Sequence, residues 1–300
     1  MSRDLRGYGG KWPEVRWPGG ARVAVSIVVN FEEGGELTVS GGDARNEAVY
    51  EVIDRQEGPD PAIESHFAYG TRAGYWRIAE VLERFGAKAT FSACGAAVEA
   101  APWLAKDAVA RGHEVAAHGY RWATHAGMGE AEERASIEGT IRAIEAATGK
   151  RPVGWHTRAP ATPRTRPLLV EYGFLYDSDA YDDDLPYFVD AGGKRHLVLP
   201  YAFDTNDMHF QHSDRFTTAE SFATYVTDAY DCLWREGERW PRMMSIGLHL
   251  RMIGRPGRIA ALERILEHIG GRGGGWLATR EGIARCWSDR AGCAAGTLVR

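Results

Sequence analysis

Short apolar runs alternate with longer amphipathic segments over most of the chain, and this alternation limits the possible folds more than any other feature. We expect strands at residues 23–29, 87–91, 114–117, 152–155, 196–200 and 243–248. We expect helices at residues 72–85, 98–111, 130–148, 165–172, 219–235 and 256–269. Strands that alternate with helices form a parallel sheet covered by helices, and about seven such units favour a closed or nearly closed barrel over an open sheet. The predicted fold is therefore α/β, a single-domain distorted (β/α) barrel with about seven strands.

The two ends of the chain differ in composition from the barrel segment. Residues 1–22 form a polar arm rich in glycine and proline, which we expect to pack on the barrel, and residues 23–287 form the catalytic barrel. Residues 288–300 are small and polar without an apolar face, so we expect a frayed C-terminal tail. With 300 residues and 44% hydrophobic composition, the chain can bury one large core.

The charge distribution argues against a nucleic-acid partner. The 36 basic and 41 acidic residues leave a net charge of −5 and form no long like-charge run. Residues 1–18 contain charges, glycine and proline in place of the apolar segment of a signal peptide or membrane span. The four cysteines have no metal-binding spacing and are expected to be reduced thiols. These features predict no membrane association, a cytoplasmic location and a small-molecule substrate.

Chemically active side chains follow the predicted strands, at the points where the strands end. They are Glu32, Glu33, His118, His156, Arg158, Asp177, Asp179, Asn206, Asp207, His249 and Arg251. Taken singly, adjacent glutamates or aspartates are commonly turn residues, and a lone histidine is commonly structural. The carboxyl ends of parallel barrel strands meet at one rim, however, so side chains from several strands converge there. This convergence predicts a catalytic site at the rim.

The order of these strand-end motifs resembles a known family. The motifs are Glu32-Glu33-Gly34, His118, Arg158-Ala159-Pro160, Asp177-Ser178-Asp179 and Leu248-His249. In this order they resemble the polysaccharide deacetylase superfamily, which implies a barrel of the NodB-homology type. Further strings, at residues 7–9, 30–36, 69–74, 118–122, 204–207, 247–249 and 253–258, resemble its branch of metal-independent allantoinases and cyclic-imide hydrolases. Tyr120 and residues 123–127, in contrast, are more similar to general deacetylases.

The resemblance implies roles for individual residues. Glu32 is the expected general base that activates water, and His249 is the expected general acid for the leaving nitrogen, with Asp179 as the next candidate acid. A purely structural role for His249 is the alternative. Arg158 would pair with a carbonyl or urea oxygen, and Trp122 would stack on a flat ring. The expected substrate-binding residues are Arg158, Trp122, Trp155 and Asn206.

The same resemblance implies Glu33 and His118 as metal ligands. Catalytic zinc usually takes three protein ligands and a water. Trp122 occupies the place of the second metal-binding histidine of the family, four residues after His118. We therefore expect no cofactor, or a weakly held divalent metal such as zinc, unless His125 or Glu36 completes the site.

These observations predict a hydrolase of a non-peptide carbon-nitrogen bond. The expected reaction is the ring opening of a small cyclic amide, either an allantoin-like ureide of purine catabolism or a cyclic imide. Two alternatives stay open, namely N-deacetylation of an amino sugar and a non-catalytic relative that binds a small molecule. The resemblance also implies a homotetramer.

Overall fold

A computed structural model of the chain describes residues 4–48, 56–211 and 216–291. Its centre is one curled sheet in which seven parallel strands follow one another in the order β7-β5-β4-β3-β2-β1-β8. These strands are β1 (Val23–Phe31), β2 (Ala89–Ala93), β3 (Glu114–Ala117), β4 (Gly154–Trp155), β5 (Tyr176–Asp177), β7 (Arg195–Val198) and β8 (Arg242–His249). Strand β6 (Tyr187–Asp190) runs antiparallel to β7, and β9 (Gly275–Leu277) pairs with the first residues of β1. The predicted α/β class and distorted barrel are confirmed.

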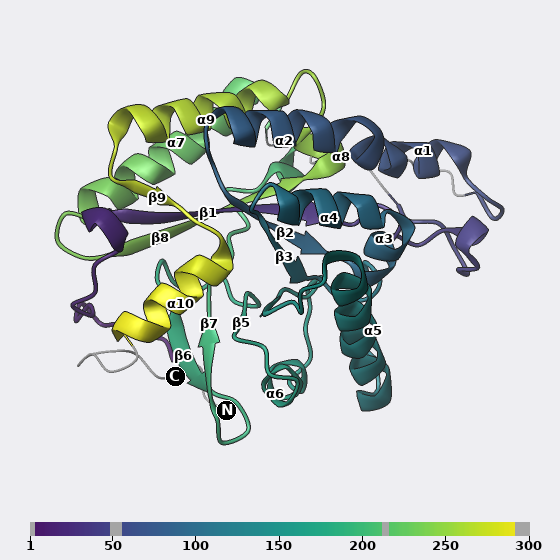
Figure 1. Ribbon diagram of the computed structural model, residues 1–300, viewed down its shortest axis with the longest axis horizontal. Helices are drawn as coiled ribbons and strands as arrows, with labels where there is room; N and C mark the ends of the chain where they lie inside the picture. The colour runs from purple at the N-terminus through teal and green to yellow at the C-terminus, as the bar shows by residue number, and fades with distance from the viewer. Residues whose placement is uncertain (1–3, 49–55, 212–215, 292–300) are drawn as a thin grey trace.

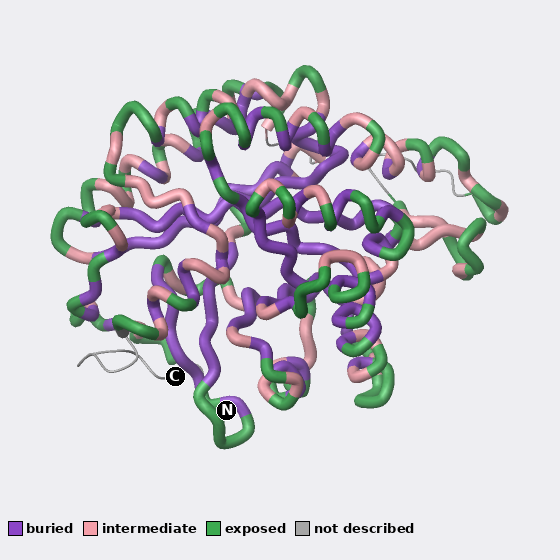
Figure 2. Tube along the Cα trace, viewed as in Figure 1, coloured by how far each residue is buried: buried purple, intermediate pink, exposed green. Residues whose placement is uncertain are grey.

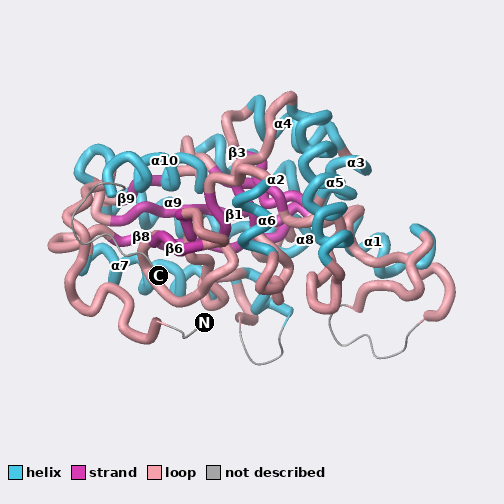
Figure 3. The backbone as a smooth tube through the Cα atoms, turned by 90° about the horizontal axis from the view of Figure 1, so that it is seen from below, coloured by secondary structure: helices cyan, strands magenta, loops and turns pink. Residues whose placement is uncertain are grey.

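Helices surround the sheet (Figure 1). They are α1 (Pro61–Tyr69), α2 (Tyr75–Arg84), α3 (Gly95–Ala100), α4 (Pro102–Ala110), α5 (Glu130–Thr148), α6 (Thr165–Glu171), α7 (Ala219–Glu236), α8 (Leu250–Ile253), α9 (Ile259–Arg272) and α10 (Arg280–Ala291). Helices α2, α7 and α9 lie together on one side of β1, whereas α3 and α4 pack against α5. Figure 3 shows α1 beyond α8, at the opposite end of the molecule from α7. No helix in the described part of the chain has both the length and the apolar surface that a bilayer crossing requires.

Three helix boundaries differ from the predictions for local reasons. The helix expected at residues 98–111 is divided into α3 and α4, because Pro102 lacks an N–H and therefore begins a new helix. The helix expected at 72–85 is preceded by α1 and joined to it by a single π-helical turn, Gly70–Gly74. At the C-terminus, α10 continues to Ala291, so the tail predicted from residue 288 is wrong over residues 288–291. Residues 292–300 lie outside the described residues.

The sheet is buried along nearly its whole length (Figure 2). Every residue of β1, β2, β3 and β8 is buried, because helices cover the outside of a parallel barrel and side chains fill its inside. A second apolar cluster joins the N-terminal arm to α10 and includes Tyr8, Trp17 and Trp287. The Nε1 of Trp17 donates to the Arg242 carbonyl at 2.7 Å, which fastens the arm to the start of β8.

The barrel is incomplete between β8 and β7. No ladder joins these two strands in the described residues, and loop backbone takes its place, since Gly247 N donates to Thr205 O at 2.9 Å. Arg280 bridges the gap from inside, donating to Ser245 Oγ at 2.8 Å and to Pro200 O at 3.1 Å. The guanidinium thus fills the barrel interior below the strand ends, paired with hydroxyl and carbonyl oxygens.

Candidate active site

Four segments bring ionisable side chains together at the carboxyl end of the sheet. Glu32 and Glu33 follow β1, His118 follows β3, His249 ends β8, and Arg251 lies in α8 directly after it. Strands β1 and β8 pair in parallel with Asn30 opposite His249, so the two strands end at the same level. The parallel register, rather than any local signal, places Glu32 beside His249.

Glu32 is the centre of this cluster. Its Oε1 lies 3.5 Å from the Nε2 of His118 and 3.6 Å from the Nε2 of His249, and its Oε2 forms an ion pair of 2.7 Å with Nη1 of Arg251. Burial alone would raise the pKa of Glu32, but Arg251, His249 and His118 outweigh burial and hold the pKa far below its ordinary value. These partners favour the ionised carboxylate of Glu32.

Glu33 lies on the other side of the same guanidinium. Its Oε1 is 3.3 Å from Nη1 of Arg251, and its Oε2 accepts the backbone N–H of Glu32 at 3.1 Å. Burial raises the pKa of Glu33 to about 7, with the charge of Glu32 adding to the shift. Burial would lower the pKa of Arg251, but the two carboxylates outweigh burial and raise it, so Arg251 stays a cation.

His249 is oriented by Asp207, which lies in the loop that closes the barrel gap. The Nδ1 of His249 donates to Asp207 Oδ1 at 2.6 Å, while Asp207 Oδ2 accepts the backbone N–H groups of His249 at 2.9 Å and Ile253 at 3.0 Å. Burial would lower the pKa of His249, but Glu32 and Asp207 outweigh burial and raise it. This pairing leaves Nε2 facing Glu32 and favours a protonated ring.

His118 is held by the backbone of the next strand end. Its Nδ1 donates to the His156 carbonyl at 2.6 Å, so Nε2 is the atom that faces Glu32. The His156 ring stacks on His118 with centroids 4.8 Å apart. Burial, reinforced by the nearby His118, lowers the pKa of His156 well below its ordinary value, so this ring is neutral.

Trp122 and Arg158 stack on each other beside Arg251. The Arg158 guanidinium lies 3.8 Å above the Trp122 ring and donates to the Trp122 carbonyl at 2.7 Å. The largely buried carboxylate of Glu47 is 3.3 Å from Arg158. Trp122 also faces the guanidinium of Arg251 at 5.0 Å. The Trp122 ring is therefore in contact with two guanidinium groups, those of Arg158 and Arg251.

The structure does not bring three of the predicted site residues into the cluster. Trp155 is fully buried in the core, where its Nε1 donates to Thr157. Asp179 accepts from Thr157 instead of approaching His249, and burial raises its pKa to about 7. Asn206 is buried against Tyr201 at 3.3 Å and bridges the backbone of Gly247. These positions follow from the tertiary packing of the strand ends, and the roles expected for these residues stay predictions.

Asp207 and Arg251 are candidate functional residues to which the sequence alone assigned no role. Both lie among the strand-end residues, but their partners are 42 and 218 residues away along the chain. One available signal was the position of Arg251 between Leu250 and Met252, because a charged residue within an apolar run at a strand end is commonly buried and paired.

The donor set does not fit a catalytic metal. The described residues contain no group of three or more His, Cys, Asp or Glu side chains placed to hold a metal ion. Nη1 of Arg251 already contacts both Glu32 and Glu33, and Trp122 offers no ligand atom. The Nδ1 of His125, the possible third ligand, is hydrogen-bonded to Glu133 at 3.1 Å. Glu36, the other possible ligand, accepts a hydrogen bond from the backbone N–H of Gly34 at 2.5 Å.

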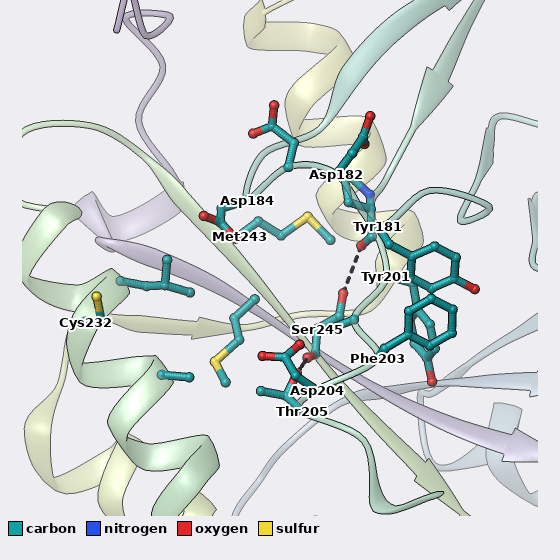
Figure 4. Close-up of a pocket in the computed structure, with 16 residues that line it drawn as sticks. Tyr181, Asp182, Asp184, Tyr201, Phe203, Asp204, Thr205, Cys232, Met243 and Ser245 are labelled. Atoms are coloured by element: carbon teal, nitrogen blue, oxygen red, sulfur yellow. Dashed lines mark hydrogen bonds between the residues drawn. The ribbon is translucent and has the colours of Figure 1, made fainter. Parts of the chain in front are cut away.

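A separate cavity of about 550 Å³ lies in the barrel gap (Figure 4). It borders Met243, Met244 and Ser245 in the first part of β8, whereas His249 ends that strand. Asp184 and Asp204 lie on its wall, and no histidine lines it. The cluster around Glu32 is thus the part of the described structure equipped for acid-base chemistry.

Three proteins are similar to this chain over nearly its whole length. The crystal structure of PuuE allantoinase is 44% identical, with a TM-score of 0.91, and the match covers 96% of this chain and 98% of that one. A Pseudomonas aeruginosa structure assigned to the polysaccharide deacetylases is 45% identical, with the same TM-score and coverage. A Schizosaccharomyces pombe protein assigned to the same group is 37% identical over 96% of this chain and 98% of its own.

The family model described as polysaccharide deacetylase matches residues 55–173, which include His118 and Arg158. With this match and 37% identity to a relative over nearly the whole of both chains, the protein belongs to the polysaccharide deacetylase family.

Proposed function

We propose that the protein hydrolyses a carbon-nitrogen bond in a small cyclic amide, such as an allantoin-like ureide or a cyclic imide. The observation that carries this proposal is the buried group of Asp207, His249, Glu32 and Arg251, which combines a base, an acid and a fixed cation. The likeness to PuuE allantoinase supports the ring-opening reaction.

The proposed reaction uses water as the nucleophile. Glu32 takes a proton from water as its oxygen attacks the ring carbonyl, and protonated His249 donates to the nitrogen as the carbon-nitrogen bond breaks. The product carries a new carboxyl group and a nitrogen that stays tethered to it. The proton on Glu32 then returns to the Nε2 of His249, 3.6 Å away, which restores both groups.

Deacetylation of an amino sugar is the second candidate, because the two other relatives are assigned to the polysaccharide deacetylases. It is less well supported by the site, since Nη1 of Arg251 contacts both Glu33, the expected metal ligand, and Glu32, the expected base. We propose that the protein works without a metal cofactor, on a small-molecule substrate and as a homotetramer. Metal analysis and light scattering of the pure protein test the metal content and the tetramer, respectively.

The deciding experiment supplies allantoin, succinimide and chitooligosaccharide to the pure protein and follows the products. We expect ring-opened acids from one or both rings, and their loss in Glu32→Gln. Faster release of acetate from the oligosaccharide would assign the second function. Binding without turnover of any of the three would indicate a non-catalytic relative.

A further inference from the structure

Arg251 has hydrogen-bonding capacity that the cluster does not use. The side chain is fully buried, and only Nη1 reaches the carboxylates of Glu32 and Glu33. Among the described residues, its Nε and Nη2 have no hydrogen-bond partner. Buried donors are normally satisfied, so two unsatisfied donors on one catalytic-site side chain point to a ligand.

These two nitrogens lie on the same edge of the planar guanidinium, the edge that grips paired or shared oxygen acceptors. Arg166 shows the edge in use in the same chain, because its Nε and Nη2 bind the two oxygens of Asp177 at 2.6 and 3.0 Å. In Arg251 the corresponding edge is buried and has no partner among the described residues. The chain therefore contains one arginine whose Nε–Nη2 edge is paired, Arg166, and one whose edge is not, Arg251.

Aromatic rings restrict what can approach this unpaired edge. The Arg251 guanidinium lies 4.3 Å from the Phe67 ring and 5.0 Å from the Trp122 ring. Rings at these positions hold the guanidinium and offer no hydrogen bonds along their faces. The two rings therefore leave the Nε and Nη2 donors without a conventional hydrogen-bond acceptor among the described residues.

We infer that the unpaired Nε–Nη2 edge of Arg251 binds the carbonyl oxygen of the ring amide and stabilises the negative charge that forms there during water attack. This inference rests on the proposed ring-opening function. Arg251 then acts as a catalytic residue in the role of a fixed cation, with Nη1 holding Glu32 beside the attacking water. Preorganised donors aimed at a developing oxyanion are among the strongest contributions to catalysis.

The test compares three variants with the wild type on the ring substrate. Arg251→Ala should lower kcat by about 10²–10³-fold with a smaller effect on KM, since removal of one such donor has that effect. Arg251→Lys keeps the charge but loses the planar edge, and it should recover only part of the rate. Arg166→Lys is the matched control, because it removes an occupied edge outside the cluster and should lower thermal stability without changing kcat per folded molecule.

Chemical rescue separates catalysis from folding. Guanidinium ion, added far below unfolding concentrations, should restore turnover to Arg251→Ala, whereas ammonium at equal ionic strength should not. Turnover of Arg251→Ala or Arg251→Lys within threefold of the wild type would overturn the inference. If Arg251→Ala does not fold, the rate of Arg251→Lys decides alone.

The proposed ring-opening function has its own test, and it is refuted if the wild type opens no ring. Calorimetric titration with succinimide then tests Arg251 by itself. We expect binding to Arg251→Lys at least tenfold weaker than to the wild type. Equal binding of succinimide to Arg251→Lys and to the wild type would refute the role assigned to Arg251.

Discussion

Asp207→Asn is the substitution that most directly tests how His249 is held. The aspartate is fully buried and makes three hydrogen bonds, one to the His249 ring and two to backbone N–H groups. An asparagine oxygen can keep the two backbone bonds, but its amide would then donate toward Nδ1 of His249. The ring would be driven into the tautomer whose proton is on Nε2, and it would lose its anionic partner.

Two magnitudes follow from this geometry. A hydrogen bond to a charged group contributes about 1.5–3 kcal/mol, so the variant should lose about 1–2 kcal/mol of unfolding free energy because the backbone bonds remain. Without the Asp207 charge the protonated form of the ring is no longer stabilised, so His249 is a much less effective acid at working pH, and we expect kcat to fall by about 10²–10⁴-fold. Catalysis should therefore suffer much more than stability.

The pH dependence has a definite sign. Because Glu32 and Asp207 raise the pKa of His249, the acid form persists above the ordinary value near 6.5, and activity is lost as pH rises through the raised pKa. Removal of the Asp207 charge should move this alkaline limit to lower pH. The assay is kcat/KM against pH, with urea unfolding in parallel.

A neighbouring residue supplies the control for this experiment. Asp204 lies in the same loop, and its carboxylate accepts from Tyr225 at 3.1 Å, away from the cluster. Asp204→Asn should leave both rate and pH limit unchanged. If Asp207→Asn retained kcat within threefold and kept the same alkaline limit, the argument that Asp207 orients and charges His249 would be refuted.

Three further results are expected. His249→Ala should lower turnover by about 10²-fold with little change in folding, and an imide should lose less than a ureide because its leaving nitrogen is already acidic; equal losses on both would move the acid role to another residue. Gly70→Ala should destabilise the protein by about 1–3 kcal/mol in thermal or urea unfolding, because a Cβ there would lie 2.3 Å from Glu33 Oε1, and an unchanged midpoint would contradict this packing. Chelator treatment should leave ring opening largely intact, and full loss that zinc reverses would show a metal requirement.

Local sequence patterns were sufficient for the barrel class and for part of the site. The alternation of apolar runs with helical segments predicted the parallel strands, because the spacing of apolar residues within each segment indicates whether it forms a helix or a strand. Glu32, His118 and His249 were predicted at the rim for a similar reason, since each directly follows an apolar run. Helix ends were also partly readable, although Pro102 divided a segment that its apolar residues suggested was continuous.

What the tertiary structure alone decided is how these residues are paired. The contacts of Asp207 with His249, Arg251 with Glu33, and Arg158 with Glu47 join residues 42, 218 and 111 positions apart. Such partners depend on strand register and on loops that cross the barrel end, and neither is encoded in local periodicity. The same long-range packing buries Trp155 in the core and directs Asp179 to Thr157. Sequence position thus determined which side chains reach the rim, and the closing of the barrel determined which of them meet, because charge pairing depends on distances between segments remote in the chain.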